Sequence, residues 1–155
     1  EYPDSNYLEE SRIMIGSCYE EQDKNDEAIA ALQKVVTDYP NSEYAVKAET
    51  YLAWIYYTKL DDTTMAVEMN QRIADNASYD YDSRKNAQYL VGEIYKLQGD
   101  NPKAIASYQK ILKDFSKPML KPNHPADRID KSYIIDLQEK KPEQPETGNS
   151  EGQGV

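Results

Sequence analysis

The sequence has little of several residue types that define whole classes of protein. It holds a single cysteine in 155 residues, Cys18, which excludes an internal disulfide framework and a cysteine-rich zinc site. No apolar run approaches the roughly 18 residues of a membrane-spanning helix, so no transmembrane segment is expected. Lys and Arg number 18 against 28 Asp and Glu, giving a net charge of -10. That balance opposes binding to nucleic acid and to anionic membranes.

Signatures of catalysis and of cofactor binding are also missing. The sequence has no glycine-rich phosphate loop, no pair of histidines at helical spacing and no nucleophile elbow. Its one histidine, His124, lies between prolines and is interpreted as a solvated loop residue. Cys18 has no basic neighbour and is interpreted as a small, buried apolar residue of a helix. We therefore expect a non-catalytic protein with no catalytic residues, no cofactor and no metal site.

One acidic stretch could be taken for a calcium site. Its polar residues are Asp75, Asn76, Asp80 and Asp82. The stretch lacks the glycine and the terminal glutamate of an EF-hand loop. We therefore interpret these side chains as turn and N-cap residues between two helices.

What the sequence does hold is an internal repeat with a period of about 38 residues. The recurring small residues are Gly16, Ala53 and Gly92 early in each unit and Ala28, Ala66 and Ala104 later in it. A tyrosine follows the first small residue of each unit by three positions. Small residues let two helices pack closely, and the tyrosine is expected to fill the space between neighbouring pairs. Because one helix pair cannot bury its apolar face alone, stacking of the units must supply the core.

Each unit is predicted to be a helix-turn-helix, which makes the fold all-α. The three units span about 5–40, 42–78 and 80–116. Ser42 is a candidate N-cap for the helix that follows it. Pro102 suits the first turn of the second helix of the third unit.

The pattern resembles the tetratricopeptide repeat, or TPR. The first unit carries the family's small residue, tyrosine, alanine, large apolar residue and proline as Gly16, Tyr19, Ala28, Leu32 and Pro40. The second unit departs most, and the usual early tryptophan is absent from all three. The resemblance implies a right-handed TPR superhelix, an α-solenoid of three units followed by a C-terminal helix, that binds a partner protein.

A narrower resemblance concerns location. The long period, the Tyr-Pro-x-Ser junctions and the segment 96–105 resemble a bacterial envelope branch of the family. That branch contains outer-membrane assembly lipoproteins and Tol-Pal cell-division coordinators. It implies a periplasmic location with an outer-membrane anchor in the parent protein, and a cytoplasmic location is the alternative. Residues 1–5 match the junction at 39–42, so we expect a further repeat before residue 1.

By resemblance, the first helices of the units line a concave groove that binds the partner. The residues carried over to the groove are Glu10, Ile13, Ser17, Glu20, Lys47, Thr50, Trp54, Tyr57, Asn86, Tyr89, Glu93 and Lys96. At its centre, Trp54, Tyr57 and Tyr89 are expected to form an aromatic cluster with a polar rim, as in a binding hot spot. Packing between units is the alternative role for these rings. The first unit lacks a basic clamp for a C-terminal carboxylate, so the expected partner is an extended or helical segment with apolar anchors and some basic charge.

The composition changes after Ser116. A proline-rich linker is expected at 117–125, a helix at 126–141 and a disordered tail at 142–155. The helix is interpreted as a cap on the solenoid, and docking on a partner is the alternative.

Two functions follow from this sequence. The first is a scaffold that holds a partner in the groove, within an envelope assembly. The second is a structural subunit that self-associates through exposed repeat ends.

Overall fold

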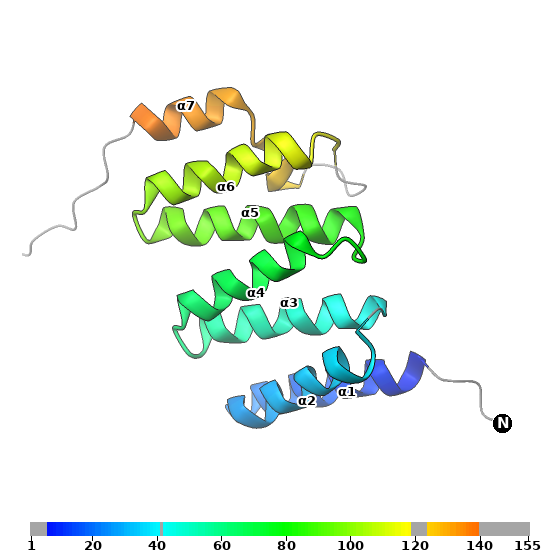
Figure 1. The fold of residues 1–155 in the computed structure, drawn as a ribbon. Coiled ribbons are helices and arrows are strands. Elements are labelled where there is room, and N and C mark those ends of the chain that lie inside the picture. The colour runs from blue at the N-terminus through cyan, green and yellow to red at the C-terminus, as the bar shows by residue number, and fades with distance from the viewer. Residues whose placement is uncertain (1–5, 41, 119–123, 140–155) are drawn as a thin grey trace, which may run out of the picture.

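The computed structural model describes residues 6–40, 42–118 and 124–139, and these residues form a stack of helices (Figure 1). The helices are α1 (Asn6–Glu21), α2 (Asn25–Asp38), α3 (Glu43–Thr58), α4 (Thr63–Asp75), α5 (Tyr81–Leu97), α6 (Asn101–Asp114), the short 3-10 helix η1 (Pro125–Arg128) and α7 (Lys131–Glu139). Within these ranges, no helix is both long enough and apolar enough to cross a membrane.

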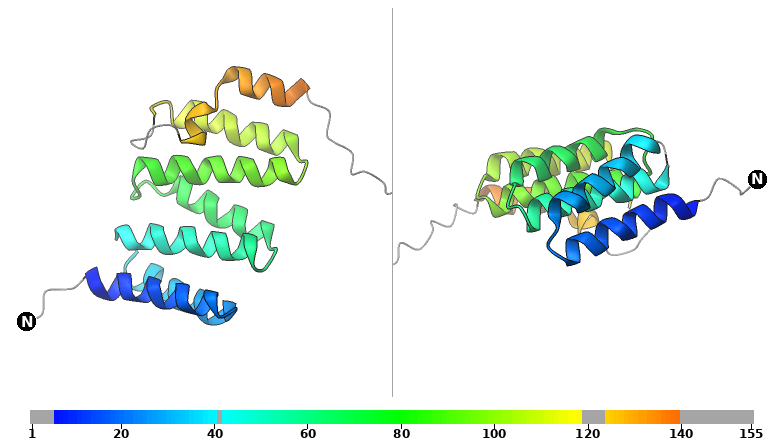
Figure 2. Two further views of the ribbon diagram at one scale, coloured as in Figure 1. Left: turned by 180° about the vertical axis from the view of Figure 1, so that it is seen from behind. Right: turned by 90° about the horizontal axis from the view of Figure 1, so that it is seen from below.

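The first six helices form three pairs that stack in chain order. Each helix from α2 to α5 contacts the helix before it and the helix after it. The pair α1–α2 forms one end of the stack and α7 lies at the other (Figures 1 and 2). The predicted all-α solenoid is therefore confirmed for the described part of the chain.

Several helices begin at a residue whose side chain caps the helix, and these N-cap residues are of types that can be recognised in the sequence. Ser42 accepts a hydrogen bond from the backbone N–H of Ala45, as predicted for an N-cap. Asp62, Asp80 and Asp100 accept equivalent bonds at the starts of α4, α5 and α6. Pro102 lies in the first turn of α6, which confirms its predicted place.

The turn inside each helix pair has the same backbone conformation. Asp23 and Asp61 have φ of 57° and 52°, and Gly99 has φ of 75°. These three residues lie at equivalent positions of the repeat. Aspartate tolerates the left-handed region better than most residues and glycine adopts it freely, so each turn uses a residue that fits.

Small residues allow the two helices of a pair to pack closely, as predicted. A Cβ atom built at Gly16 would lie 2.9 Å from Cγ of Leu32, and one built at Gly92 would lie 2.3 Å from Cε1 of Tyr108. In the middle pair, Ala53 fills the matching position and is 2% exposed. These contacts set the close approach of the first helix to the second.

The core is divided among the interfaces of the stack. One cluster joins α2, α3 and α4, and its buried residues are Ala28, Leu32, Val35, Ala48, Leu52, Ala53, Ile55 and Met69. The repeated tyrosines Tyr19 and Tyr56 pack against this cluster. Tyr95 packs against a second cluster, which α6 forms with the C-terminal segment. The predicted role as fillers between units is confirmed for Tyr19 and Tyr56, whereas Tyr95 packs between its own pair and the C-terminal segment.

The predicted C-terminal helix at 126–141 is wrong at its start. Residues 125–128 form η1, Ile129 is extended, and α7 begins at Lys131. Asp130 explains the break, because its Oδ1 accepts hydrogen bonds from the Tyr133 N–H at 2.8 Å and from Ser132 Oγ at 2.6 Å. An aspartate that bonds the backbone in this way favours a helix start over a helix interior.

The C-terminal segment is tied to α5 and α6. Ile134 and Leu137 of α7 share an apolar cluster with Tyr108, Ile111 and Phe115. Buried Lys85 of α5 pairs with Asp127 of η1 and donates to the Lys117 carbonyl at 2.8 Å. The capping role of α7 is a prediction that these contacts support. The predictions for residues 1–5, for most of the linker, for the end of the helix beyond 139 and for the tail lie outside the described residues.

Candidate functional site

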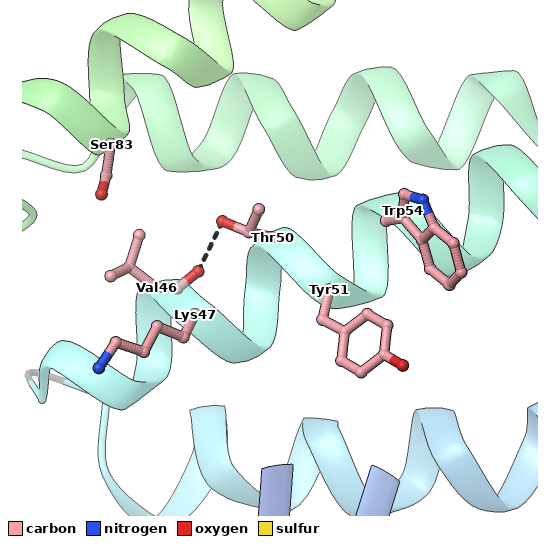
Figure 3. A pocket seen from close by; sticks show the side chains of 6 residues that line it. All are labelled: Val46, Lys47, Thr50, Tyr51, Trp54 and Ser83. Atoms are coloured by element: carbon pink, nitrogen blue, oxygen red, sulfur yellow. Dashed lines mark hydrogen bonds between the residues drawn. The ribbon is translucent and has the colours of Figure 1, made fainter. Parts of the chain in front are cut away.

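A hollow of about 350 Å³ lies beside α3. Its lining residues are Val46, Lys47, Thr50, Tyr51 and Trp54 of α3 and Ser83 of α5 (Figure 3). The hollow therefore lies between the first helices of two neighbouring pairs. Three of the twelve residues predicted for the groove line it, namely Lys47, Thr50 and Trp54.

Helical spacing brings these residues together. Lys47, Thr50, Tyr51 and Trp54 follow the spacing of one helix face, separate from the buried stripe of α3. The Trp54 side chain is 43% exposed, and its ring centroid lies 5.5 Å from that of Tyr51. The Thr50 hydroxyl donates to the Val46 carbonyl at 2.7 Å, so the helix itself uses this polar group (Figure 3). What the hollow offers a ligand is mainly aromatic and aliphatic surface.

Tyr51 is held by a polar network that reaches across to α1. Its hydroxyl donates to Oε2 of Glu20 at 3.1 Å, and Lys59 forms an ion pair with Glu20 at 2.7 Å. The Lys59 hydrogen bond holds the pKa of Glu20 below its usual value. Burial raises the pKa of Tyr51, so its hydroxyl stays protonated and remains a donor at neutral pH.

The structure separates the groove residues predicted in the first unit from the hollow. Glu20 is 7% exposed and engaged by α3, so it supports the site and does not face a partner. Ile13 packs against the core cluster, and Ser17 is half-buried. Glu10 is exposed on α1 and does not line the hollow.

Two of the groove residues predicted in the third unit, Tyr89 and Lys96, contact the C-terminal segment. Lys96 Nζ pairs with Glu93 at 2.7 Å and donates to the Tyr133 hydroxyl of α7 at 3.1 Å. Burial alone would lower the pKa of Lys96, but these two partners raise it. The Tyr108 hydroxyl donates to Glu93 Oε1 at 2.6 Å. Lys96 therefore contacts α7, and Glu93 joins Lys96 to Tyr108 of α6.

Tyr89 is covered in the same way. Its ring lies 6.4 Å from that of Tyr108 and 6.0 Å from the imidazole of His124, centroid to centroid. Burial raises the pKa of Tyr89. The prediction that His124 is a solvated loop residue is wrong, because it is half-buried, packs on Tyr89 and accepts the Ala126 N–H at its Nδ1. A folded-back segment, not a free linker, surrounds it.

The predicted aromatic cluster of Trp54, Tyr57 and Tyr89 is wrong. The ring partner of Trp54 is Tyr51, whereas Tyr89 packs with rings of α6 and of the C-terminal segment. Tyr57 is half-buried and lies outside the lining of the hollow. Asn86 is also half-buried and outside it.

Sequence reasoning missed three residues of the hollow: Val46, Tyr51 and Ser83. Tyr51 lies three positions before Trp54 on the same helix face, so the helical stripe of α3 contained the signal for it. Ser83 belongs to the first turn of α5, and only the contact between two helix pairs brings it to the hollow.

Two other sequence interpretations have different outcomes. Asp80 caps α5 by accepting the Ser83 N–H at 2.9 Å, and Asn76 accepts the Ser78 N–H at 3.0 Å, which confirms their turn and N-cap roles. The interpretation of Cys18 as a buried residue is wrong, because its side chain is exposed. Cys18 lies on the side of α1 that no described helix covers.

Comparison with known proteins supports the repeat. A family model of the tetratricopeptide repeat matches residues 10–42 and 86–117. The matches fall on the pair α1–α2 and on the pair α5–α6. Two of the three helix pairs are therefore similar to tetratricopeptide repeats, a family that generally mediates protein–protein interaction. No curated protein matches this sequence.

Proposed function

We propose that this protein is a non-catalytic scaffold that holds a segment of a partner protein in the hollow beside α3. The observation that carries this proposal is Trp54, a large ring left 43% exposed next to Tyr51 in a mainly apolar hollow. Tryptophan and tyrosine are enriched among the residues that dominate binding energy. Covering such a ring with a partner's side chain removes apolar surface from water, at about 25 cal/mol for each Å².

The partner segment in this proposal is extended or helical, with an apolar anchor and flanking basic residues. The hollow, at about 350 Å³, is near the lower end of the size range of ligand sites, so it suits one anchoring side chain of the segment. The chain's net charge of -10 attracts basic segments and speeds their encounter. The anchor then supplies affinity, and the surrounding charge supplies orientation.

The test is selection of short peptides from a displayed random library on the immobilised chain. The selected peptides should share an apolar anchor with basic neighbours, and Trp54→Ala should weaken their binding by at least about tenfold, as for a hot-spot residue. Leu97→Ala is the matched control, because Leu97 is a 70% exposed apolar residue outside the hollow. Equal binding by Trp54→Ala and the parent chain would overturn the proposal.

The envelope setting is a separate part of the proposal and rests on the resemblance of the junctions and the long period. In it, the protein acts in the periplasm as part of an outer-membrane assembly, within an anchored parent. Fractionation of source cells, with detection of the chain by antibody, tests this placement. Recovery in the cytoplasmic fraction would overturn it and leave the scaffold role intact.

A second candidate function is self-association as a structural subunit. The exposed apolar residues of α1 at one end of the stack favour it. Sedimentation of the pure chain over a range of concentrations distinguishes the two functions. A scaffold stays monomeric until a partner is added, whereas a self-associating subunit gains mass on its own.

A further inference from the structure

The outer side of α1 carries exposed apolar residues along its length. Tyr7 is 77% exposed, Leu8 54%, Met14 63% and Ile15 49%. Cys18 continues the stripe one turn further and is also exposed. This helix lies at the end of the stack, as the view from below shows (Figure 2). A continuous apolar stripe on an outer helix marks an interaction surface, in contrast to single exposed apolar residues.

The repeat shows what the same positions do in the other pairs. The alignment that places Gly16 on Ala53 and Gly92 also places Ser11, Ile15 and Cys18 on Ala48, Leu52 and Ile55 of α3 and on Ala87, Val91 and Ile94 of α5. All six of the aligned residues are buried, and none is more than 6% exposed. The stripe that is bare on α1 is therefore covered on both later first helices.

The cover on those helices comes from the second helix of the preceding pair. On α3 it is α2, whose Ala28, Leu32 and Val35 share one cluster with Ala48, Leu52 and Ile55. On α5 it is α4, whose Ile73 and Ala74 share a cluster with Ala87. The covering stripe of α2 is a small residue, a large apolar residue four positions later and a β-branched residue three positions after that.

We propose that the outer face of α1 docks the second helix of a further helix pair, stacked on α1 as α2 stacks on α3. The occupant carries a stripe like that of α2. Sequence continuity points the same way, because Tyr2-Pro3-Asp4-Ser5 precedes α1 as Tyr39-Pro40-Asn41-Ser42 precedes α3. This inference does not depend on the hollow beside α3.

A second copy of the chain is a poorer occupant. The stripes of α2 and α4 are buried inside the stack. The matching stripe of α6, with Ala104, Tyr108 and Ile111, shares its cluster with α7. Among the described helices, no second helix is free to reach the α1 face of another molecule.

The test extends the full chain by one helix pair in register. A copy of residues 6–37 carrying Cys18→Ile is placed directly before Glu1, so that Glu1 and Tyr2-Pro3 stand where Asp38 and Tyr39-Pro40 stand in the first pair. Cys18 of the original α1 is then the only thiol. Its alkylation by iodoacetamide under native conditions should slow at least about tenfold, because a covered thiol reacts only from opened states.

A matched variant shows whether docking causes the protection. Leu8→Asp in the original α1 should restore fast alkylation in the extended chain, since it places a charge under the docked helix. In the unextended chain Leu8 is 54% exposed, so the same change should leave helix content unaltered. A second extension, built from a copy of residues 43–74, guards against a folding failure peculiar to the first copy.

Two results would overturn the proposal. The first is unchanged Cys18 alkylation in both extended chains, with helix content raised by the added pair. The second is a dimer of the unextended chain that Ile15→Asp abolishes in sedimentation, which would assign the face to a second copy.

Discussion

At the scale of single residues, Gly92 allows α5 to approach α6 more closely than Gly16 allows α1 to approach α2. A Cβ atom there would lie 2.3 Å from the ring of Tyr108, which is fully buried and anchored to Glu93 through its hydroxyl. At Gly16 the nearest atom is Cγ of Leu32, at 2.9 Å. The two glycines hold the same position of the repeat, but an added Cβ atom would clash more severely at Gly92 than at Gly16.

This difference predicts unequal costs of the same substitution. Gly92→Ala should lower the free energy of unfolding by about 1–3 kcal/mol, as expected when a well-packed site is overfilled. Gly16→Ala should lie within about 1 kcal/mol of the parent, because the helix preference of alanine offsets a smaller clash. Urea unfolding of the two variants measures both values. Equal costs would contradict the role given to the anchored Tyr108 ring.

Glu20 predicts a dependence of stability on pH. The Lys59 hydrogen bond lowers its pKa from 4.5, so the charged carboxylate is favoured in the folded state. Its contribution is complete above the unfolded value and is lost as the pH falls through the lower folded value. Glu20→Gln should therefore be less stable than the parent at pH 7, and the gap should close at acidic pH below 4.5.

Urea unfolding at pH 7 and in the acidic range measures this gap. Glu21→Gln is the control, because Glu21 is an exposed neighbour of the same type on the same helix. A gap that persists unchanged in acid would show that Glu20 acts through packing and not through its charge.

At the scale of secondary-structure elements, the C-terminal helix α7 packs on α6 through one of its faces. Ile134 is 6% exposed and lies in the cluster on α6, whereas the adjacent Ile135 is 51% exposed. The two residues are chemically identical neighbours, one on the buried face of α7 and one on its exposed face. They provide an internal comparison of the packing between α7 and the stack.

Truncating each side chain should separate the two faces. Ile134→Ala should cost about 2 kcal/mol of unfolding free energy, because it opens a cavity against α6. Ile135→Ala should change stability by less than about 0.5 kcal/mol, as for an exposed position. Thermal or urea unfolding of the pair tests this. Similar costs at both positions would mean that α7 does not pack on α6 through this face.

The helices of the repeat also show which features of the fold and of the site can be predicted from the sequence. The all-α solenoid is predictable because Gly16 and Gly92 mark close helix contacts and Ser42 marks a helix start. Lys47, Thr50 and Trp54 lie together because helical spacing alone puts them on one face. These signals are local to one helix or one repeat.

The sequence predictions that failed concern contacts between residues far apart in the chain. His124 and Tyr133 return to α5 and cover Tyr89 and Lys96, and no local pattern predicts this fold-back. The break at Asp130 came from competition between a side-chain cap and a continuous apolar stripe, which the stripe alone cannot decide. The exposure of Cys18 depends on which helix pair is its neighbour, not on its own helix.

At the scale of the whole molecule, the two ends of the described helix stack differ in how much apolar surface they expose. At one end α1 presents its apolar stripe, and at the other α7 shares a cluster with α6. Each end of a helix stack contacts only one neighbour, so the ends decide what the stack can join.

Removing α7 should make the ends complementary. A chain that ends after residue 118 leaves Tyr108, Ile111 and Phe115 without their α7 neighbours, and the α1 stripe of a second molecule fits that surface as α3 fits α2. Its mass in sedimentation should rise with concentration, and the same truncation with Ile15→Asp should stay monomeric. A truncated chain that stays monomeric throughout would contradict this picture.

The placement of α7 on α6 makes stacking at the two ends of the described segment unequal. Because α7 lies on the apolar face of α6, a helix pair of another molecule cannot stack there as α3 stacks on α2, whereas the apolar face of α1 is exposed. Repeating head-to-tail contacts that do not close into a ring lead to open filaments. Because α7 occupies one end of the described stack, copies of this segment cannot extend such a contact from molecule to molecule through that end.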